Sequence, residues 1–158
     1  MANILSPIQL IGEGVTKVDV EVNTSIKEFK HAAAEFGVTR EISRVKNPDK
    51  GDNENAQYSG SLSVNANLYN DEKMSLKELS VSMTVHGMIH ISLSALSEEM
   101  LDDLDKVADF NFTSLLYSYA RIQIERFIAS TPYQQLNLPT ISIQGLLDSL
   151  SETDETEE

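Results

Sequence analysis

A long helix is predicted from about Asn111 to Ser130, and its apolar side chains extend around most of its circumference. At 100° per residue these side chains span an arc of roughly 240°. They are Phe112, Leu115, Leu116, Tyr117, Tyr119, Ala120, Ile122, Ile124, Phe127 and Ile128. A surface helix of a small monomer needs an apolar stripe only somewhat wider than about 100°. We therefore expect this helix to be covered from two sides.

Four segments ahead of this helix have the alternating pattern of half-buried strands. They run from Ile8 to Val22, Val38 to Val45, Tyr58 to Leu68 and Leu79 to Ser92. Because four strands can cover only one side of the long helix, a second copy of the chain is the economical cover for the other side. The polar faces of the third and fourth strands are uncharged, which is unusual for a sheet face that meets only water. Either strand-compatible Ser and Thr occur there by chance, or this face meets a partner subunit.

Three connecting segments have patterns of their own. In the connection from Ile26 to Gly37, the apolar residues have helical spacing, so one or two helical turns are expected there. The polar segment from Lys46 to Ala56 is rich in turn formers and is expected to be an exposed loop. Ser97 is expected to cap a helix that begins with two glutamates, whose charges suit the positive end of the helix dipole.

Length and charge limit the organisation of the chain. Its 158 residues suffice for one domain with its own core, which we assign to residues 1–150. Residues 151–158 are acidic and almost without apolar side chains, so they are expected to form a disordered tail. A net charge of −13 disfavours nucleic acid and anionic lipid as partners.

The sequence lacks the signals of export and membrane insertion. The N-terminus has no basic residue ahead of an apolar core, and no run approaches the roughly 20 apolar residues that span a bilayer. The chain also contains no cysteine, which fits a reducing compartment. We therefore expect a cytoplasmic protein without membrane insertion.

No motif for catalysis, cofactor binding or metal binding is present. The sequence has no Gly-rich phosphate loop, no Gly-x-Ser-x-Gly and no His-Glu-x-x-His. His86 and His90 share one face of a strand, but at about 3.3 Å per residue their backbones lie roughly 13 Å apart, too far for one zinc ion. We expect neither an enzyme nor a metal site nor a bound cofactor.

Two short motifs follow one another near the end of the chain. Tyr119-Ala120-Arg121 lies in the long helix, and Gln135-Leu136-Asn137-Leu138 follows a turn that contains Pro132. This order resembles the C-terminal half of SecB, the tetrameric chaperone that holds secretory preproteins unfolded in the bacterial cytoplasm. In that family a Pro-Tyr-Ala-Arg helix precedes Phe-Pro-Gln-Leu-Asn-Leu and a last helix. Here Ser118 replaces the first proline, and Tyr133-Gln134 replaces Phe-Pro.

The resemblance implies an α+β fold in which a four-stranded antiparallel sheet is followed by two to three helices. It also implies a dimer of dimers, a homotetramer whose long helices are sandwiched between sheets. Candidate residues of the oligomer interface are Leu115, Leu116, Tyr119 and Ile122. For Arg121 the resemblance suggests a recurring structural role, with an ion pair or a helix cap favoured over substrate contact.

In SecB-like proteins the client groove runs between the sheet, the connection after the first strand, and the helices. The corresponding residues here are Phe29, Phe36, Met83, Val85, Leu138, Ile141 and Leu146. Ordinary core packing is the alternative for each of them. Flexible methionine side chains would suit a groove that accepts many sequences.

The function implied is that of an ATP-independent holdase that binds unfolded or partly folded polypeptides. One use is protein export, in which acidic residues on the polar sheet face dock on the motor SecA. Asp19 and Glu21 are the candidates here. On the fourth strand, however, Ser80, Ser82 and Thr84 stand where an acidic docking site would be expected. Another is care of one dedicated client, such as the antitoxin of a toxin-antitoxin-chaperone system. The alternative from a different class is a structural or assembly protein with one fixed partner on the apolar helix face.

Overall fold

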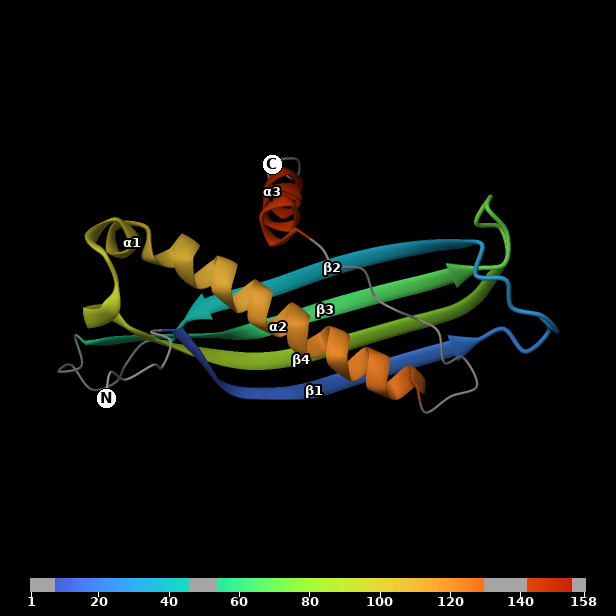
Figure 1. Ribbon diagram of the computed structural model, residues 1–158, viewed down its shortest axis with the longest axis horizontal. Helices are drawn as coiled ribbons and strands as arrows, with labels where there is room; N and C mark the ends of the chain where they lie inside the picture. Colours follow the sequence, from blue (N-terminus) through green and yellow to red (C-terminus); the bar gives the residue numbers. More distant parts are fainter. Residues whose placement is uncertain (1–7, 46–53, 130–141, 155–158) are drawn as a thin grey trace, which may run out of the picture.

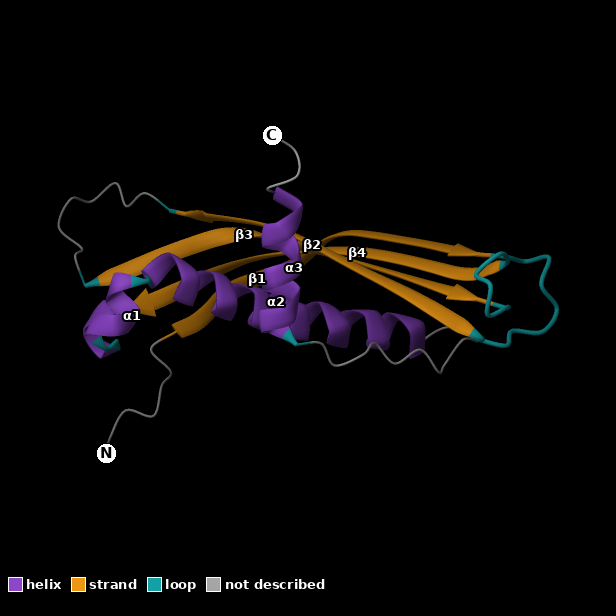
Figure 2. Cartoon of the chain, turned by 90° about the horizontal axis from the view of Figure 1, so that it is seen from above, coloured by secondary structure: helices purple, strands orange, loops and turns teal. Residues whose placement is uncertain are grey.

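The computed structural model describes residues 8–45, 54–129 and 142–154. A four-stranded antiparallel sheet of order β1-β4-β3-β2 carries the long helix α2 on one face, and α3 stands beside the edge strand β2 (Figures 1 and 2). The elements are β1 (Ile8–Val22), β2 (Ala33–Arg44), β3 (Asn55–Tyr69), β4 (Lys77–Ser92), a 3-10 turn (Leu93–Ala95), α1 (Glu98–Asp102), α2 (Leu104–Ala129) and α3 (Ile143–Asp154). The predicted fold class, an antiparallel four-stranded sheet followed by helices, is confirmed.

The prediction of helical turns between β1 and β2 is wrong. β2 begins at Ala33, which pairs with Tyr69, so residues 33–37 are strand, and residues 23–32 contain no helix. Phe36 consequently belongs to β2, where it lies opposite Ala66. Pairing with β3 satisfies the backbone of this segment and outweighs its weak local preference for helix.

The core lies between α2 and the helix-facing side of the sheet. Alternate residues of β3 and β4 contribute to it together with one face of α2. Its buried residues are Ala56, Tyr58, Leu62, Val64, Ala66, Leu68, Leu79, Val81, Met83, Val85, Ile89, Ile91, Ala108, Phe112, Leu116, Tyr117, Ala120, Ile124 and Ile128. Gly87 lets α2 approach closely, since a Cβ atom there would lie 2.6 Å from Cδ2 of Leu116.

Polar contacts fix the N-terminal part of α2 over β2 and β3. The Arg40 guanidinium donates to Asp109 Oδ2 at 2.7 Å, and the Tyr58 hydroxyl donates to Asp105 Oδ1 at 2.5 Å. Burial, together with this bond to Asp105, raises the pKa of Tyr58 to about 12. Tyr58 therefore remains a donor at any physiological pH.

The helix boundaries differ from the expected ones at two places. The Ser97 hydroxyl caps α1 as predicted, by accepting from the Met100 amide at 3.4 Å, but α1 ends at Asp102 and α2 already begins at Leu104. α3 continues to Asp154, so the first half of the expected disordered tail, residues 151–154, is helical, while 155–158 lie outside the described residues. Extending an existing helix is easier than nucleating one, and no Gly or Pro interrupts it there. No helix in the described part is long and apolar enough to cross a membrane.

Candidate functional site

The helix-facing side of the sheet is only partly covered. α2 crosses it on a diagonal, from the C-terminal end of β2 towards β1 (Figure 1). Apolar side chains of both edge strands remain exposed beside it: Val15 (39%) and Val18 (38%) on β1, and Phe36 (38%) on β2. We call these three residues the uncovered apolar surface. Because isolated exposed apolar residues are ordinary, the significant point is that all three lie on the face that carries the core.

Bulges in β1 bring Val15 and Val18 to the same face. A regular strand would place residues three apart on opposite faces. The register of β1 shifts between Val15 and Lys17, so that Val15 lies opposite Val85 and Val18 lies opposite Met83, both core residues. The extra residue in the bulge therefore widens the apolar face of this edge strand.

α2 exposes apolar side chains as well. Phe110, Ile122 and Phe127 are 41%, 47% and 40% exposed. Leu115 and Tyr119 are half-buried and, at spacings of four and three residues, share a helix face with Ile122. The sheet of one chain thus covers one side of α2. α3 also contacts α2, but Phe110, Ile122 and Phe127 stay exposed.

The expected oligomer-interface residues divide into two groups. Leu116 is fully buried against the sheet, so its assignment to an interface between copies is wrong; it is a core residue of the single chain. Leu115 and Tyr119 pack only partly against the core, and Ile122 is exposed. These last three stay candidates for contact with a second copy.

The expected groove residues are dispersed. Met83 and Val85 are buried beneath α2, and ordinary core packing holds for both. Phe36 is exposed on β2, Phe29 is half-buried in the connection 23–32, and Leu146 is half-buried in α3. Leu138 and Ile141, like the motif at 135–138, lie outside the described residues. Sequence reasoning did not include Val15 or Val18 among the site residues, since nothing in the sequence marks the bulge that brings Val15 to the face of Val18.

The opposite face of the sheet, which points away from α2 (Figure 2), carries mainly polar side chains. Asp19 and Glu21 are exposed there on β1, opposite Ser82 and Ser80, and Asp19 pairs with Lys17 at 2.9 Å. In the centre of this face, neutral side chains bond across strands: Ser63 with Thr84 at 2.8 Å, and Ser80 with Asn67 at 2.7 Å. Glu35 and Glu41 of β2, opposite Asn67 and Ser61, lie on the same face. The acidic side chains therefore lie at the two edges of a surface whose centre is neutral.

The described residues offer little for covalent or metal chemistry. A cavity of about 380 Å³ beside the N-terminal part of α2 is lined by Ile42, Ser43, Arg44, Tyr58, Asp105, Lys106 and Asp109. Asp105 and Asp109 accept the bonds from Tyr58 and Arg40 that attach the helix to the sheet. Across residues 8–45, 54–129 and 142–154, no three His, Asp or Glu side chains are arranged to hold a metal ion. Arg121 forms an intrahelical ion pair with Glu125 at 3.0 Å, in agreement with the favoured structural role.

No protein-family model matches the chain, and no curated protein matches it. Among solved structures, the fold is similar to that of the Mycobacterium tuberculosis Rv1957 SecB-like chaperone in complex with a ChAD peptide from the Rv1956 HigA1 antitoxin. The similarity covers 85% of this chain and 91% of that chain, with a TM-score of 0.57 and 14% sequence identity. The chain therefore has a SecB-like fold.

Proposed function

We propose that this protein is a chaperone that binds non-native polypeptide without nucleotide. The observation that carries the proposal is the uncovered apolar surface of Val15, Val18 and Phe36, which flanks α2 on both edge strands. An unfolded chain offers scattered apolar side chains and unpaired backbone groups, and exposed apolar residues next to sheet edges can accept both. The similarity to a SecB-like chaperone solved with an antitoxin peptide supports the same reading.

We propose further that the active form is a homotetramer in the cytoplasm. The face of α2 that carries Leu115, Tyr119 and Ile122 would be covered by a second copy. This agrees with the apolar arc of roughly 240°, which is too wide for one sheet to cover. Covering that face would still leave the edge-strand residues Val15, Val18 and Phe36 for a client. In this way assembly would use α2, and client binding would use the edge strands.

Of the two biological uses, we favour a dedicated client over general export. Export would require docking on SecA through acidic residues, yet the centre of the polar sheet face is formed by neutral side chains such as Ser80, Ser82 and Thr84. The carboxylates of this face lie on the two edge strands, Asp19 and Glu21 on β1 and Glu35 and Glu41 on β2. The similar mycobacterial chaperone is in complex with a peptide from an antitoxin, which supports a client of this kind here.

Replacing Phe36 with serine is expected to weaken suppression of aggregation of a chemically denatured model substrate. The Phe36 ring is 38% exposed, so it can still bury part of its apolar area against a client. Losing that contact should cost about 1 kcal/mol, or roughly fivefold in affinity. The measurement is light scattering of the aggregating substrate without nucleotide, at several chaperone concentrations.

Met100→Ser is the matched control, since Met100 is 45% exposed but lies on α1, at the other end of the molecule from the start of β2 (Figure 1). A Phe29→Ser, Phe36→Ser pair should lose more activity than Phe36→Ser alone. A wild-type protein that suppresses no aggregation and binds one fixed partner would contradict the holdase proposal in favour of an assembly protein.

Binding to SecA is expected to be weak or absent in titration calorimetry. Ser82 lies opposite Asp19, so Ser82→Glu would extend the acidic edge into the centre of the polar face, and it should strengthen whatever SecA binding occurs. The exposed substitution Lys17→Ser serves as a control for the local change in charge. Tight SecA binding by the wild type would return the protein to the export class.

A further inference from the structure

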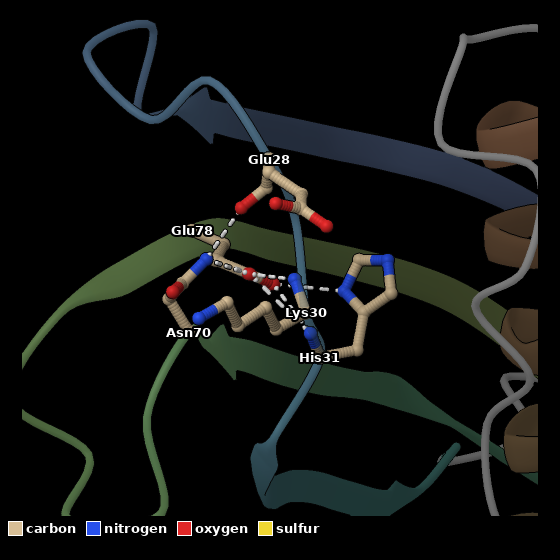
Figure 3. A network of polar contacts seen from close by, with 5 residues as sticks. All are labelled: Glu28, Lys30, His31, Asn70 and Glu78. Carbon is tan, nitrogen blue, oxygen red and sulfur yellow. Dashed lines mark hydrogen bonds and ion pairs between the residues drawn. The ribbon is translucent and has the colours of Figure 1, made fainter.

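A buried carboxylate at the start of β4 joins the β1–β2 connection to the β3–β4 hairpin at the end of the sheet (Figure 3). Glu78 stands at the start of β4 with a fully buried side chain. The pairing of β3 with β4 passes from Leu68–Leu79 to Tyr69–Lys77, so Glu78 is the extra residue of a bulge. A bulge redirects the side chain of its extra residue. Here the Glu78 carboxylate meets the connection 23–32.

Both carboxylate oxygens of Glu78 accept hydrogen bonds from this connection. Oε1 accepts from the Lys30 amide at 2.5 Å, and Oε2 accepts from the His31 amide at 3.2 Å. Oε2 also lies 2.8 Å from His31 Nδ1, in the geometry of an ion pair. The Asn70 side-chain amide donates to Glu78 Oε1 at 2.6 Å and to the Glu28 carbonyl at 2.7 Å. The carboxylate thus bonds the β1–β2 connection and the β3–β4 hairpin together.

The backbone of the connection is shaped to hold an anion. His31 has a φ of 48°, in the left-handed region that few residues other than glycine adopt. Successive amides around a left-handed residue converge into a concave anion site, which the Glu78 carboxylate fills. Without that carboxylate, the Lys30 and His31 amides would lose the bonds that favour this unusual backbone conformation.

The charge of Glu78 is maintained by its donors. Burial would raise its pKa, but hydrogen bonds from the Lys30 amide, the Asn70 side chain and the His31 amide outweigh burial, so the pKa lies below its ordinary value of 4.5. The other charged groups of the contact are Lys30 and Glu28 on the connection and Lys77 beside Glu78 on β4. The carboxylate is therefore ionised across the physiological range.

The same connection carries Phe29, whose ring stacks on the His31 imidazole with centroids 6.3 Å apart and an interplanar angle of 23°. We propose that Glu78 is a positioning residue, which fixes the connection 23–32 so that the Phe29–His31 pair is held ready to contact a client polypeptide. The part that concerns clients rests on the proposed chaperone function. The fixed connection itself does not.

Hydrogen exchange of the Lys30 and His31 amides in Glu78→Gln tests the fixed connection. In the wild type we expect both amides to be protected although they lie in irregular structure, and in Glu78→Gln we expect exchange at least tenfold faster, because an amide NH₂ replaces one acceptor oxygen. Amides in the centre of β4 should stay unchanged. Glu28→Gln, on the same connection, is the matched control and should leave both amides protected.

Acid titration of the wild type gives a second readout. Because the folded pKa of Glu78 is depressed, its bonds are present above the ordinary value of 4.5 and are lost as the pH falls through the folded pKa. In the wild type, protection of the Lys30 and His31 amides should therefore decrease as the pH falls below 4.5 and Glu78 becomes protonated. If Glu78→Gln does not fold, Asn70→Ala keeps the carboxylate and should give a smaller increase in exchange. Unprotected Lys30 and His31 amides in the wild type would overturn the proposal.

Client affinity completes the test. If the connection occupies its binding position only part of the time, the apparent affinity for a client falls in proportion to the fraction of chains in that position. We therefore expect Glu78→Gln to bind a denatured model substrate about tenfold more weakly. Freed amides with unchanged affinity would overturn the positioning role. A wild type that binds no client would contradict the proposed function instead, and the exchange result would still decide whether Glu78 fixes the connection.

Discussion

Leu116→Asp is expected to unfold the protein, whereas Ile122→Asp is expected to leave each chain folded and to separate assembled copies. Leu116 is fully buried between α2 and the sheet at Gly87, so an aspartate would place an unpaired carboxylate in the core. That costs several kcal/mol, a large part of the roughly 5–15 kcal/mol that stabilise a domain. Ile122 is 47% exposed, so an aspartate there meets water in the single chain.

Circular dichroism and light-scattering mass distinguish the two outcomes. Ile122→Asp should keep the wild-type spectrum with a mass nearer to the 17.5 kDa of one chain, since the charge would be buried only between copies. Ile122→Ser is a milder control at the same position. A wild type that is itself a 17.5 kDa monomer would contradict the proposed tetramer, and a stably folded Leu116→Asp would contradict the burial of that residue.

The regular parts of this fold can be predicted from periodicity. The alternation of Val18, Val20 and Val22 places β1, and β3 and β4 follow the same rule over longer segments. The wide apolar arc of α2 also follows from spacing alone. The arc indicates that α2 is covered from two sides. Spacing alone cannot say which residues pack against the sheet of the same chain, so Leu116 was predicted at the interface between copies although it is a core residue.

Irregular backbone explains most of what the sequence did not reveal. Val15 and Val18 share a face only because of a bulge, and Glu78 turns inward only because of another. A glutamate at the start of a strand normally indicates an exposed side chain. Its buried role depends on the left-handed backbone of His31, a residue 47 positions earlier whose conformation no local pattern indicates.

The centre of the polar sheet face, formed by β3 and β4, is neutral in the structure as the sequence indicated. Its neutral side chains bond across strands, as Ser63 does with Thr84 and Ser80 with Asn67, so part of their polarity is satisfied within the sheet. Such internal bonds account for Ser and Asn in paired positions without a partner subunit. The distinctive surface of the chain therefore lies on the other, helix-facing side.

Gly60→Ala is expected to cause the second large effect, by forcing β2 away from β3. A Cβ atom on Gly60 would lie 1.9 Å from the Glu41 carbonyl oxygen and 2.9 Å from the Ile42 Cα, so it collides with backbone that cannot move alone. We expect the free energy of unfolding to fall by about 3 kcal/mol, the upper part of the range for overpacking, and the urea midpoint to fall with it.

Gly37→Ala, on β2 itself with nothing within 4 Å of the added Cβ, is the matched control and should be neutral or slightly stabilising. Since β2 carries Phe36, Gly60→Ala should also weaken aggregation suppression while Gly37→Ala does not. Equal midpoints for the two variants would contradict the close approach of β2 and β3 at this position.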